Sequence, residues 1–248
     1  MVYQIKMDDA FVLKEIKLNK EEIQKEKQEI DILLQLEHRR IVPFYGYEIK
    51  ENALLLYFQK MEKGSLDTFI DANGVLSEKQ TCLYTRQILD GLNYLHLHKP
   101  QIIHRDIKGG NILMENSSSV KLSDFGVSKI ISELTEARTH AGTFKWMAPE
   151  IILGEKAPYT VKADIWSVGC TVVEMLTGKP PFHNLGHPQR ILKMLGKIKP
   201  EYQLNPEASQ ELQDFLDAIF IYNPSDRPSA YELIDHPFVA FKYQAAVT

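Results

Sequence analysis

Residues 104–111 read His-Arg-Asp-Ile-Lys-Gly-Gly-Asn, and Asp124-Phe125-Gly126 follows eighteen positions after Asp106. These two segments contain the groups that phosphoryl transfer requires. Asp106 could accept the proton of an attacking hydroxyl, and Lys108 could offset negative charge on the transferred group. Asn111 and Asp124 offer the hard oxygen ligands that Mg²⁺ prefers. Any one of these residues alone would more often be a turn former or a helix cap, so the prediction depends on the ordered set.

Size and composition limit the class of protein that could carry out this chemistry. The chain has 248 residues, enough for one large domain or two compact lobes, and 44% of them are hydrophobic and 25% charged, as in soluble globular proteins. The net charge of −4 and the scattered basic residues argue against a nucleic-acid or membrane-surface partner. No apolar stretch approaches the roughly 18 residues of a membrane span. Cys82 and Cys170 lack metal-ligand spacing, so we expect buried free thiols in a reducing compartment. That fits a cytoplasmic or nuclear protein, and we expect a cytoplasmic one.

The first part of the chain predicts strands around one charged helix. Residues 10–17 and 53–59 have strand patterns. Residues 20–37, rich in Glu, Lys and Gln, predict an amphipathic helix. We expect its buried stripe to contain Ile23, Ile30, Leu33 and Leu34. Residues 63–65 then indicate a linker.

Helices are predicted for most of the remaining chain. A capping box at residues 77–80 opens a helix whose apolar face carries Tyr84, Ile88, Leu92 and Leu95. Residues 162–177 are apolar nearly all round, which indicates a buried helix ending at Gly178. A further helix carries Leu212, Phe215, Leu216 and Ile219, and Ser229 caps a last one. Residues 117–119, three serines, are expected to form a hairpin turn.

Residues 104–111 and residues 142–150, Gly-Thr-Phe-Lys-Trp-Met-Ala-Pro-Glu, resemble the catalytic loop and the end of the activation segment of the eukaryotic protein kinase family. Within that family the chain is similar to the MAP kinase kinase kinases of the sterile-11-like group, over essentially its whole length. The resemblance implies an α+β fold with two lobes. Residues 1–60 would form a small lobe of antiparallel sheet with one helix, residues 61–64 a hinge, and residues 65–248 a larger, mainly helical lobe.

The same resemblance implies roles for individual residues. The catalytic residues would be Asp106, Lys108 and Thr143, the last helping to mark a kinase for serine and threonine, and Asn111 and Asp124 would bind Mg²⁺. Lys14 would hold the ATP phosphates, with Glu29 as its ion-pair partner, although both residue types are most often solvated. Phe58 would be the gatekeeper behind the adenine. The remaining nucleotide-binding residues would be Val2, Val12, Gln59, Met61, Ser65 and Leu113.

Regulatory and structural residues are implied as well. Arg105 would pair with a phosphate in the activation segment, on Thr139, Thr135 or Ser132, each of which could instead be an unmodified loop residue. Glu150 and Arg227 would form a buried ion pair, and Asp164 would brace the catalytic-loop backbone. Four further residues would form a column of side chains through both lobes, or would simply be core: Leu33, Phe44, His104 and Phe125.

The chain departs from the family at its beginning. No glycine occurs before Gly46, so the first strand and the glycine-rich loop that covers the nucleotide phosphates are missing from this sequence. We expect either a chain cut short or a protein that lacks the loop.

The first hypothesis for function is an ATP- and Mg²⁺-dependent serine/threonine protein kinase. It would act on a protein such as a MAP kinase kinase, after autophosphorylation or the action of an upstream kinase. A pseudokinase-like scaffold is the second hypothesis, and a small-molecule phosphotransferase of the aminoglycoside-kinase type is a third. That third type would not be expected to carry residues 148–150, Ala-Pro-Glu.

Overall fold

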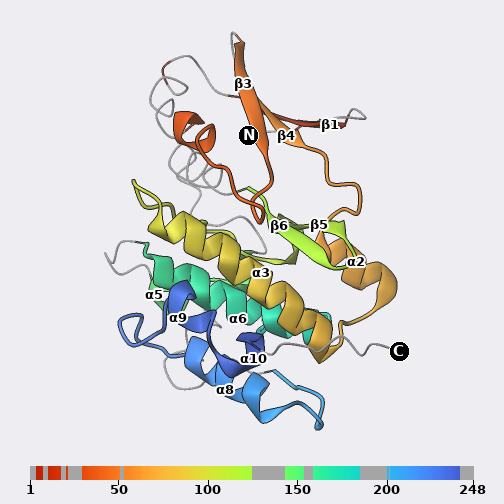
Figure 1. Cartoon of the computed structure of the whole chain (residues 1–248), viewed down its shortest axis with the longest axis vertical. Helices are drawn as coiled ribbons and strands as arrows, with labels where there is room; N and C mark the ends of the chain where they lie inside the picture. The colour runs from red at the N-terminus through yellow and green to blue at the C-terminus, as the bar shows by residue number, and fades with distance from the viewer. Residues whose placement is uncertain are drawn as a thin grey trace.

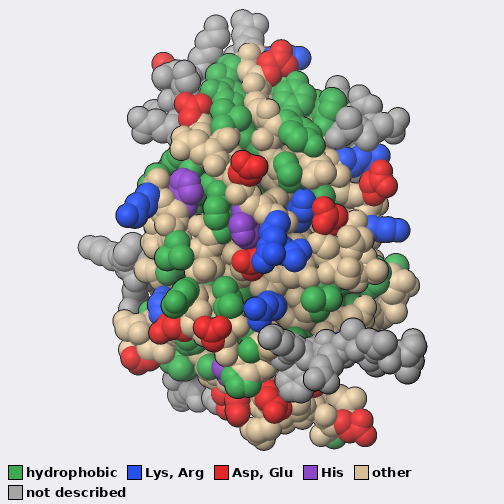
Figure 2. Space-filling model, in the orientation of Figure 1, with side chains coloured by type: hydrophobic (Ala, Val, Ile, Leu, Met, Phe, Trp, Pro, Cys, Tyr) green, Lys and Arg blue, Asp and Glu red, His purple; other side chains and the backbone are tan. Residues whose placement is uncertain are grey.

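The computed structural model describes residues 4–7, 11–17, 21, 30–50, 53–124, 143–153, 159–184, 200 and 202–240. Two parts stand one above the other in Figure 1. The upper part is built on an antiparallel sheet and the lower part on helices, with a short hairpin at their junction. Acidic, basic and apolar side chains are mixed over the face of the molecule that Figure 2 shows.

The upper part is a four-stranded sheet in the order β1-β2-β4-β3. Its strands are β1 (Gln4–Met7), β2 (Phe11–Ile16), β3 (Phe44–Lys50) and β4 (Ala53–Gln59). The strands β2 and β4 confirm the two sequence predictions. The apolar run of β4 places it inside the sheet, between β2 and β3, where Leu54 and Leu56 are fully buried. Register pairs Val12 with Phe58 across β2 and β4, so these two side chains lie on the same face.

The described end of the charged helix buries part of the predicted apolar stripe. Residues 30–33 are helical, and Ile30 and Leu33 are buried as expected. The prediction for Leu34 is wrong, because its side chain is 49% exposed. The helix ends at Leu33, and residues 34–35 form a turn. Leu34 therefore leaves the helical face that packs on the core, and Leu36 after the turn is buried in its place. Ile23 lies outside the described residues.

The lower part is mainly helical. Its longer helices are α2 (Leu66–Asn73), α3 (Glu78–Leu97), α6 (Val161–Thr177) and α8 (Gln210–Ile219). Shorter turns of helix are η1 (Gly109–Asn111), η2 (Thr143–Lys145), α5 (Pro149–Ile152), α9 (Ala230–Leu233) and α10 (Pro237–Ala240). The predicted cap at Ser77 accepts the Gln80 N–H, which is one of the two bonds of the predicted capping box. The predicted cap at Ser229 forms a complete capping box, and Gly178 ends α6 as predicted, with a φ of 76°.

Helix α6 is the buried centre of the lower part, as its apolar sequence predicts. Gly169 lets α8 approach closely, since a Cβ there would lie 2.5 Å from Ile219 Cγ2. Trp166 packs edge-on against Phe220 with ring centroids 5.0 Å apart. Cys82 and Cys170 are buried and free, as expected. Among the helices of the described ranges, none combines the length and the apolar character that crossing a membrane requires.

A hairpin joins the two parts. Its strands are β5 (Ile112–Asn116) and β6 (Ser119–Leu122), which meet at the predicted serine turn. Leu122 anchors the loop before β3, because its carbonyl accepts from Val42 N–H (2.9 Å) and its own N–H donates to the Arg40 carbonyl (2.8 Å). Met114 N–H donates to the Gly64 carbonyl in the connection between the parts (2.9 Å). The hairpin therefore fixes Ser123 and Asp124, which directly follow it, at the junction.

Candidate active site

The catalytic-loop residues predicted from the sequence lie together. Lys108 Nζ donates to both carboxylate oxygens of Asp106, at 3.0 and 2.8 Å. Asn111 Nδ2 donates to Asp106 Oδ2 and to the Asp106 carbonyl, both at 2.7 Å. These bonds hold the Asp106 carboxylate between a cation and an amide. Asp106 and Lys108 remain partly exposed, with side-chain exposures of 20% and 23%, so a substrate can reach them.

Ser123 links Asn111 to Asp124 through hydrogen bonds. The Ser123 N–H and hydroxyl both donate to the Asn111 carbonyl, at 2.9 and 3.1 Å. Asp124 follows directly, in the left-handed region with a φ of 63°. The Asn111 amide nitrogen is committed to Asp106, which leaves its Oδ1 as the atom able to ligate a metal. The Asn111 amide oxygen and the Asp124 carboxylate are hard oxygen donors that fit Mg²⁺, whose remaining ligands would be nucleotide phosphates and water.

Lys14 reaches from the sheet to the metal-binding end of the site. Its Nζ forms an ion pair with Asp124 Oδ1, although 110 positions separate the two residues in the sequence. The same ammonium lies 5.5 Å from the centroid of the Phe58 ring. Lys14 therefore faces the junction between the two parts rather than solvent, where a phosphate group could bind it. Its predicted partner Glu29 lies outside the described residues.

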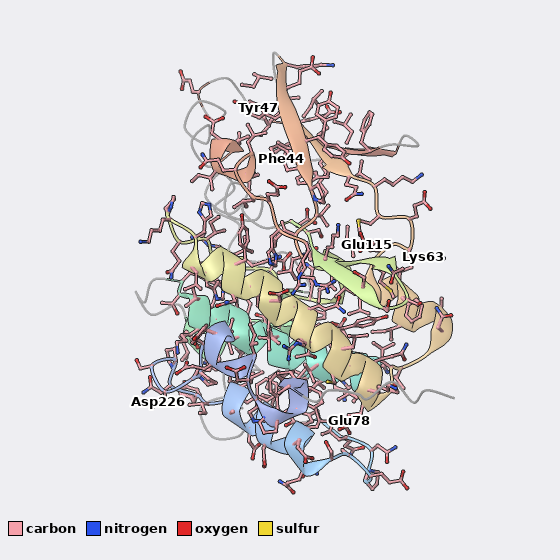
Figure 3. The ribbon with its side chains drawn as sticks, in the orientation of Figure 1. Phe44, Tyr47, Lys63, Glu78, Glu115 and Asp226 are labelled. Atoms are coloured by element: carbon pink, nitrogen blue, oxygen red, sulfur yellow. The ribbon has the colours of Figure 1, made fainter. Side chains whose placement is uncertain are left out.

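The residues predicted to hold the adenine lie at the same junction. Phe58 is 5% exposed and packs against Phe44, with ring centroids 5.0 Å apart. Phe44 is labelled in Figure 3 near the end of β3 that meets the lower part. Met61 is buried, and Ser65 forms an isolated antiparallel bridge with Leu113. This bridge brings the linker and β5 together below the sheet.

Some backbone groups of the linker already form hydrogen bonds within the protein. Gln59 N–H donates to the Pro43 carbonyl at 2.9 Å, and the Met61 carbonyl accepts from Gly64 N–H at 3.1 Å. The Gln59 carbonyl and the Met61 N–H are consequently the groups that could bind the edge of a base. Gly64 turns the chain with a φ of 71°, a conformation that favours glycine.

Because Phe58 fills the space beside Lys14, we expect inhibitors that extend behind the adenine to bind poorly. Phe58→Ala should tighten binding of such a compound about tenfold or more, since overpacking of that size costs about 1–3 kcal/mol. Competition with a fluorescent ATP analogue would measure this. Phe11→Ala is the matched control, because Phe11 lies on the opposite face of the sheet, against Tyr57. Tight binding of the bulky compound to the unmodified chain would contradict the Phe58 assignment.

Asp164 braces the catalytic-loop backbone, which confirms the sequence prediction. Its side chain is 1% exposed and accepts from His104 N–H (2.9 Å), Arg105 N–H (2.8 Å) and His96 Nε2 (2.8 Å). Burial favours protonation of this carboxyl, but the bond from His96 and the charges of both histidines outweigh it and lower the pKa of Asp164. Arg105, which is held with a φ of 70°, also accepts from Tyr159 Oη through its carbonyl, at 3.0 Å.

The predicted ion pair between Glu150 and Arg227 is also confirmed. Arg227 Nη1 and Nη2 donate to the two Glu150 carboxylate oxygens at 2.9 and 3.2 Å. The Arg227 side chain is fully buried, lies 5.1 Å from the Trp166 ring, and donates to the Lys162 carbonyl at 2.6 Å. The pair thus ties α5 to the loop before α9.

Several predicted residues fall outside what the structure describes. These are Val2, Glu29, Phe125, Ser132, Thr135 and Thr139. Thr143 begins η2, but its side chain is not among those described. The phosphate-binding role of Arg105 and the column of Leu33, Phe44, His104 and Phe125 therefore stay predictions, although Leu33 and His104 are both buried.

The sequence reasoning missed Tyr159, whose bond to the Arg105 carbonyl is described above, and Glu174, which also contacts the catalytic loop. Glu174, on α6, accepts from Gly109 N–H and from Trp146 Nε1, both at 3.0 Å. The signal was present in the sequence, because an acidic residue within the apolar run of residues 172–176 must be buried with partners.

Comparisons with known proteins agree with this fold. The family model described as protein kinase domain matches residues 1–239. Mitogen-activated protein kinase kinase kinase 3 of Homo sapiens is 43% identical over 221 residues, covering 87% of this chain and 34% of that protein. The protein of the same name from Arabidopsis thaliana is 36% identical over 237 residues, covering 96% and 38%. Serine/threonine-protein kinase dst1 of Dictyostelium discoideum is 38% identical over 240 residues, covering 96% and 30%.

The chain belongs to the protein kinase family. The expected α+β two-lobed fold and the resemblance to MAP kinase kinase kinases are thereby confirmed. The chain spans about a third of the length of the curated relatives that it matches.

Proposed function

We propose that this chain is an ATP- and Mg²⁺-dependent serine/threonine protein kinase. The observation that carries the proposal is the arrangement of Lys108 and Asn111 around the Asp106 carboxylate, within 2.7–3.0 Å. The ion pair of Lys14 with Asp124, across the junction of the two lobes, supports it. A scaffold that only binds partners would not require these five residues to converge. The match to the protein kinase family, with Ala148-Pro149-Glu150, argues against a small-molecule phosphotransferase.

Each residue has a distinct task in the proposed transfer. The hydroxyl oxygen of the substrate forms a bond to the γ-phosphorus of ATP, the bond from that phosphorus to the bridging oxygen breaks, and ADP leaves. Asp106 orients the hydroxyl and takes its proton. Lys108 places positive charge beside the transferred group, and Lys14 binds the α- and β-phosphates. Asn111 and Asp124 would hold Mg²⁺, which when bound neutralises charge on the phosphates.

The substrate class is proposed from the relatives. Two of them are named as MAP kinase kinase kinases and one as a serine/threonine-protein kinase. We infer that this chain acts in the cytoplasm on serine or threonine hydroxyls of another protein kinase, of the MAP kinase kinase class. We further infer that phosphorylation at Thr139, Thr135 or Ser132, by an upstream kinase or by the chain itself, creates a partner for Arg105.

A transfer assay with γ-labelled ATP tests the proposal. We expect label to enter a general protein substrate when Mg²⁺ is present and to be lost when EDTA is added. Acid hydrolysis should yield phosphoserine and phosphothreonine. Label in phosphotyrosine alone would overturn the substrate assignment, and no transfer under any condition would favour the scaffold.

A further inference from the structure

Asp67, in the first turn of α2, lies against the catalytic loop, because α2 packs on η1. A Cβ placed on Gly110 would lie 3.0 Å from Asp67 Oδ2 and 3.8 Å from Lys108 Cε. The Lys108 ammonium in turn donates to Asp106 Oδ2 at 2.8 Å. The Asp67 carboxylate therefore lies beside the cation that flanks the proposed catalytic base, although it belongs to another element of the lower lobe.

The position of this carboxylate depends on two glycines of the loop. The separation of 3.0 Å is shorter than an ordinary van der Waals contact, so an alanine at position 110 would push Asp67 Oδ2 aside. Gly109 gives room in the same way, since a Cβ there would lie 3.1 Å from Asp67 Cβ. The glycines let α2 approach the loop and leave the space beside Lys108 to the Asp67 side chain.

The two oxygens of the Asp67 carboxylate have different surroundings. Oδ1 accepts from Thr68 N–H at 2.6 Å and from the Ser65 hydroxyl. These bonds serve the start of α2, where a negative charge is favourable. Among the residues that the structure describes, none donates a hydrogen bond to Oδ2. Asp67 is half-buried, so Oδ2 is the atom that can bind a group from another molecule.

The charges around the loop favour a cation as that group. Burial, and to a smaller degree the charge of Asp67, act to raise the pKa of Glu174 to about 7, so these two carboxyl groups are close enough to interact. The carboxyl groups of Asp67, Asp106 and Glu174 thus lie near one ammonium, that of Lys108. A positively charged side chain of a substrate would complement this excess of negative charge, and a carboxylate would be repelled.

We propose that Asp67 is a specificity-determining residue, whose carboxylate binds a lysine or arginine side chain of the protein substrate close to the acceptor hydroxyl. The inference rests on the proposed kinase function and adds a feature of its substrate. Asp106 orients the hydroxyl, so a substrate chain that crosses the loop passes Gly110 and Asp67 Oδ2. An extended chain advances about 3.3 Å per residue, which places the basic residue within about three positions of the acceptor.

Serine peptides that differ at a single position test this preference. Each carries one arginine, glutamine or glutamate within about three residues of the acceptor, on either side, and kcat/KM is measured with saturating ATP at low ionic strength. For the wild-type chain we expect one position at which arginine raises kcat/KM about tenfold over glutamine, through a charge-assisted hydrogen bond. The gain should shrink at about 0.5 M salt. If arginine gives no gain at any position, the proposal is wrong.

Asp67→Asn separates recognition from structure, because asparagine keeps an oxygen that can accept from Thr68 N–H. We expect the ratio of kcat/KM for the arginine and glutamine peptides to fall to about one, mainly through a higher KM for the arginine peptide. A merely structural role would lower kcat/KM for both peptides together and leave their ratio at the wild-type value. That outcome would overturn the proposal.

Two further variants support the comparison. Gly110→Ala moves the carboxylate without removing its charge, so the arginine preference should fall here too, even if Asp67→Asn folds poorly. Asp71→Asn removes an exposed carboxylate one turn later on the same helix and should keep the wild-type ratio. An equal loss of preference in Asp71→Asn would show that the preference reflects the general charge of α2 and not a contact of Asp67.

Two outcomes separate this proposal from the proposed function. If the wild-type chain phosphorylates the arginine and glutamine peptides equally well, the role of Asp67 is wrong while the kinase function stands. If no peptide is phosphorylated, the proposed function fails, and fluorescence anisotropy of the labelled peptides still tests the contact. Tighter binding of the arginine peptide to the wild-type chain than to Asp67→Asn would support it, and equal binding would overturn it.

Discussion

Replacing Asp106 with asparagine should lower the rate of phosphoryl transfer about 10³-fold while leaving the fold intact, because general base catalysis contributes about 10²–10⁴-fold. Asparagine has nearly the same shape and keeps one side-chain oxygen that can accept from Lys108 Nζ, which lies 2.8 Å from Asp106 Oδ2. It cannot take the proton of the substrate hydroxyl. Single-turnover transfer of labelled phosphate to a protein substrate measures the loss.

The matched control is Asp71→Asn, an exposed aspartate on α2 in the same lobe, which should transfer phosphate at the wild-type rate. Binding of a fluorescent ATP analogue should be unchanged in both variants, since the groups proposed to bind phosphate are elsewhere. An Asp106→Asn chain with the wild-type rate would show that Asp106 is not the base, whatever the reaction proves to be.

Removing the Asp164 carboxylate should cause a large loss of stability of the folded chain. We expect Asp164→Ala to lower the free energy of unfolding by about 3–5 kcal/mol, because it leaves three buried donors without their acceptor. Two of these donors are the backbone N–H groups of His104 and Arg105, at 2.9 and 2.8 Å from the carboxylate. Arg105 holds a left-handed φ of 70°, and the bond to Asp164 helps to maintain it. Urea unfolding followed by circular dichroism measures the change.

The pH dependence of stability gives a second measurement on Asp164. Its pKa is lowered in the folded state, so its ionisation contributes stability that is fully present above its ordinary pKa of 3.8 and is lost as the pH falls through the folded value. The Asp164→Ala chain should lack this acid-side loss. Asp214→Ala, on the exposed face of α8, is the control and should unfold like the wild-type chain. A similar stability for all three chains would show that Asp164 does not brace the loop.

Local patterns predicted the elements and the catalytic loop well, because caps, periodicity and short motifs are properties of neighbouring residues. The capping box at Ser229 and the end of α6 at Gly178 are of this kind. Leu34 was predicted wrongly because periodicity does not show where a helix stops. The pairing of Lys14 with Asp124 depends on chain segments far apart, and only the family resemblance indicated that both belong to one site. The contact of Glu174 with Trp146 was not predicted at all.

Asp164 and Glu174 lie ten residues apart on α6, about 15 Å along the helix axis at 1.5 Å per residue. Their carboxylates accept from Arg105 N–H and Gly109 N–H, so both ends of the catalytic loop are bonded to the buried helix at the centre of the lower part. Loop amides normally exchange their hydrogens with solvent quickly. These two should exchange as slowly as the amides of α6, as NMR in deuterated water would show, whereas the exposed Lys63 amide in the linker should exchange fast. Exchange at Arg105 and Gly109 as fast as at Lys63 would contradict this. Slow exchange at Arg105 and Gly109 would mean that the catalytic loop opens only when the core of the lower lobe opens.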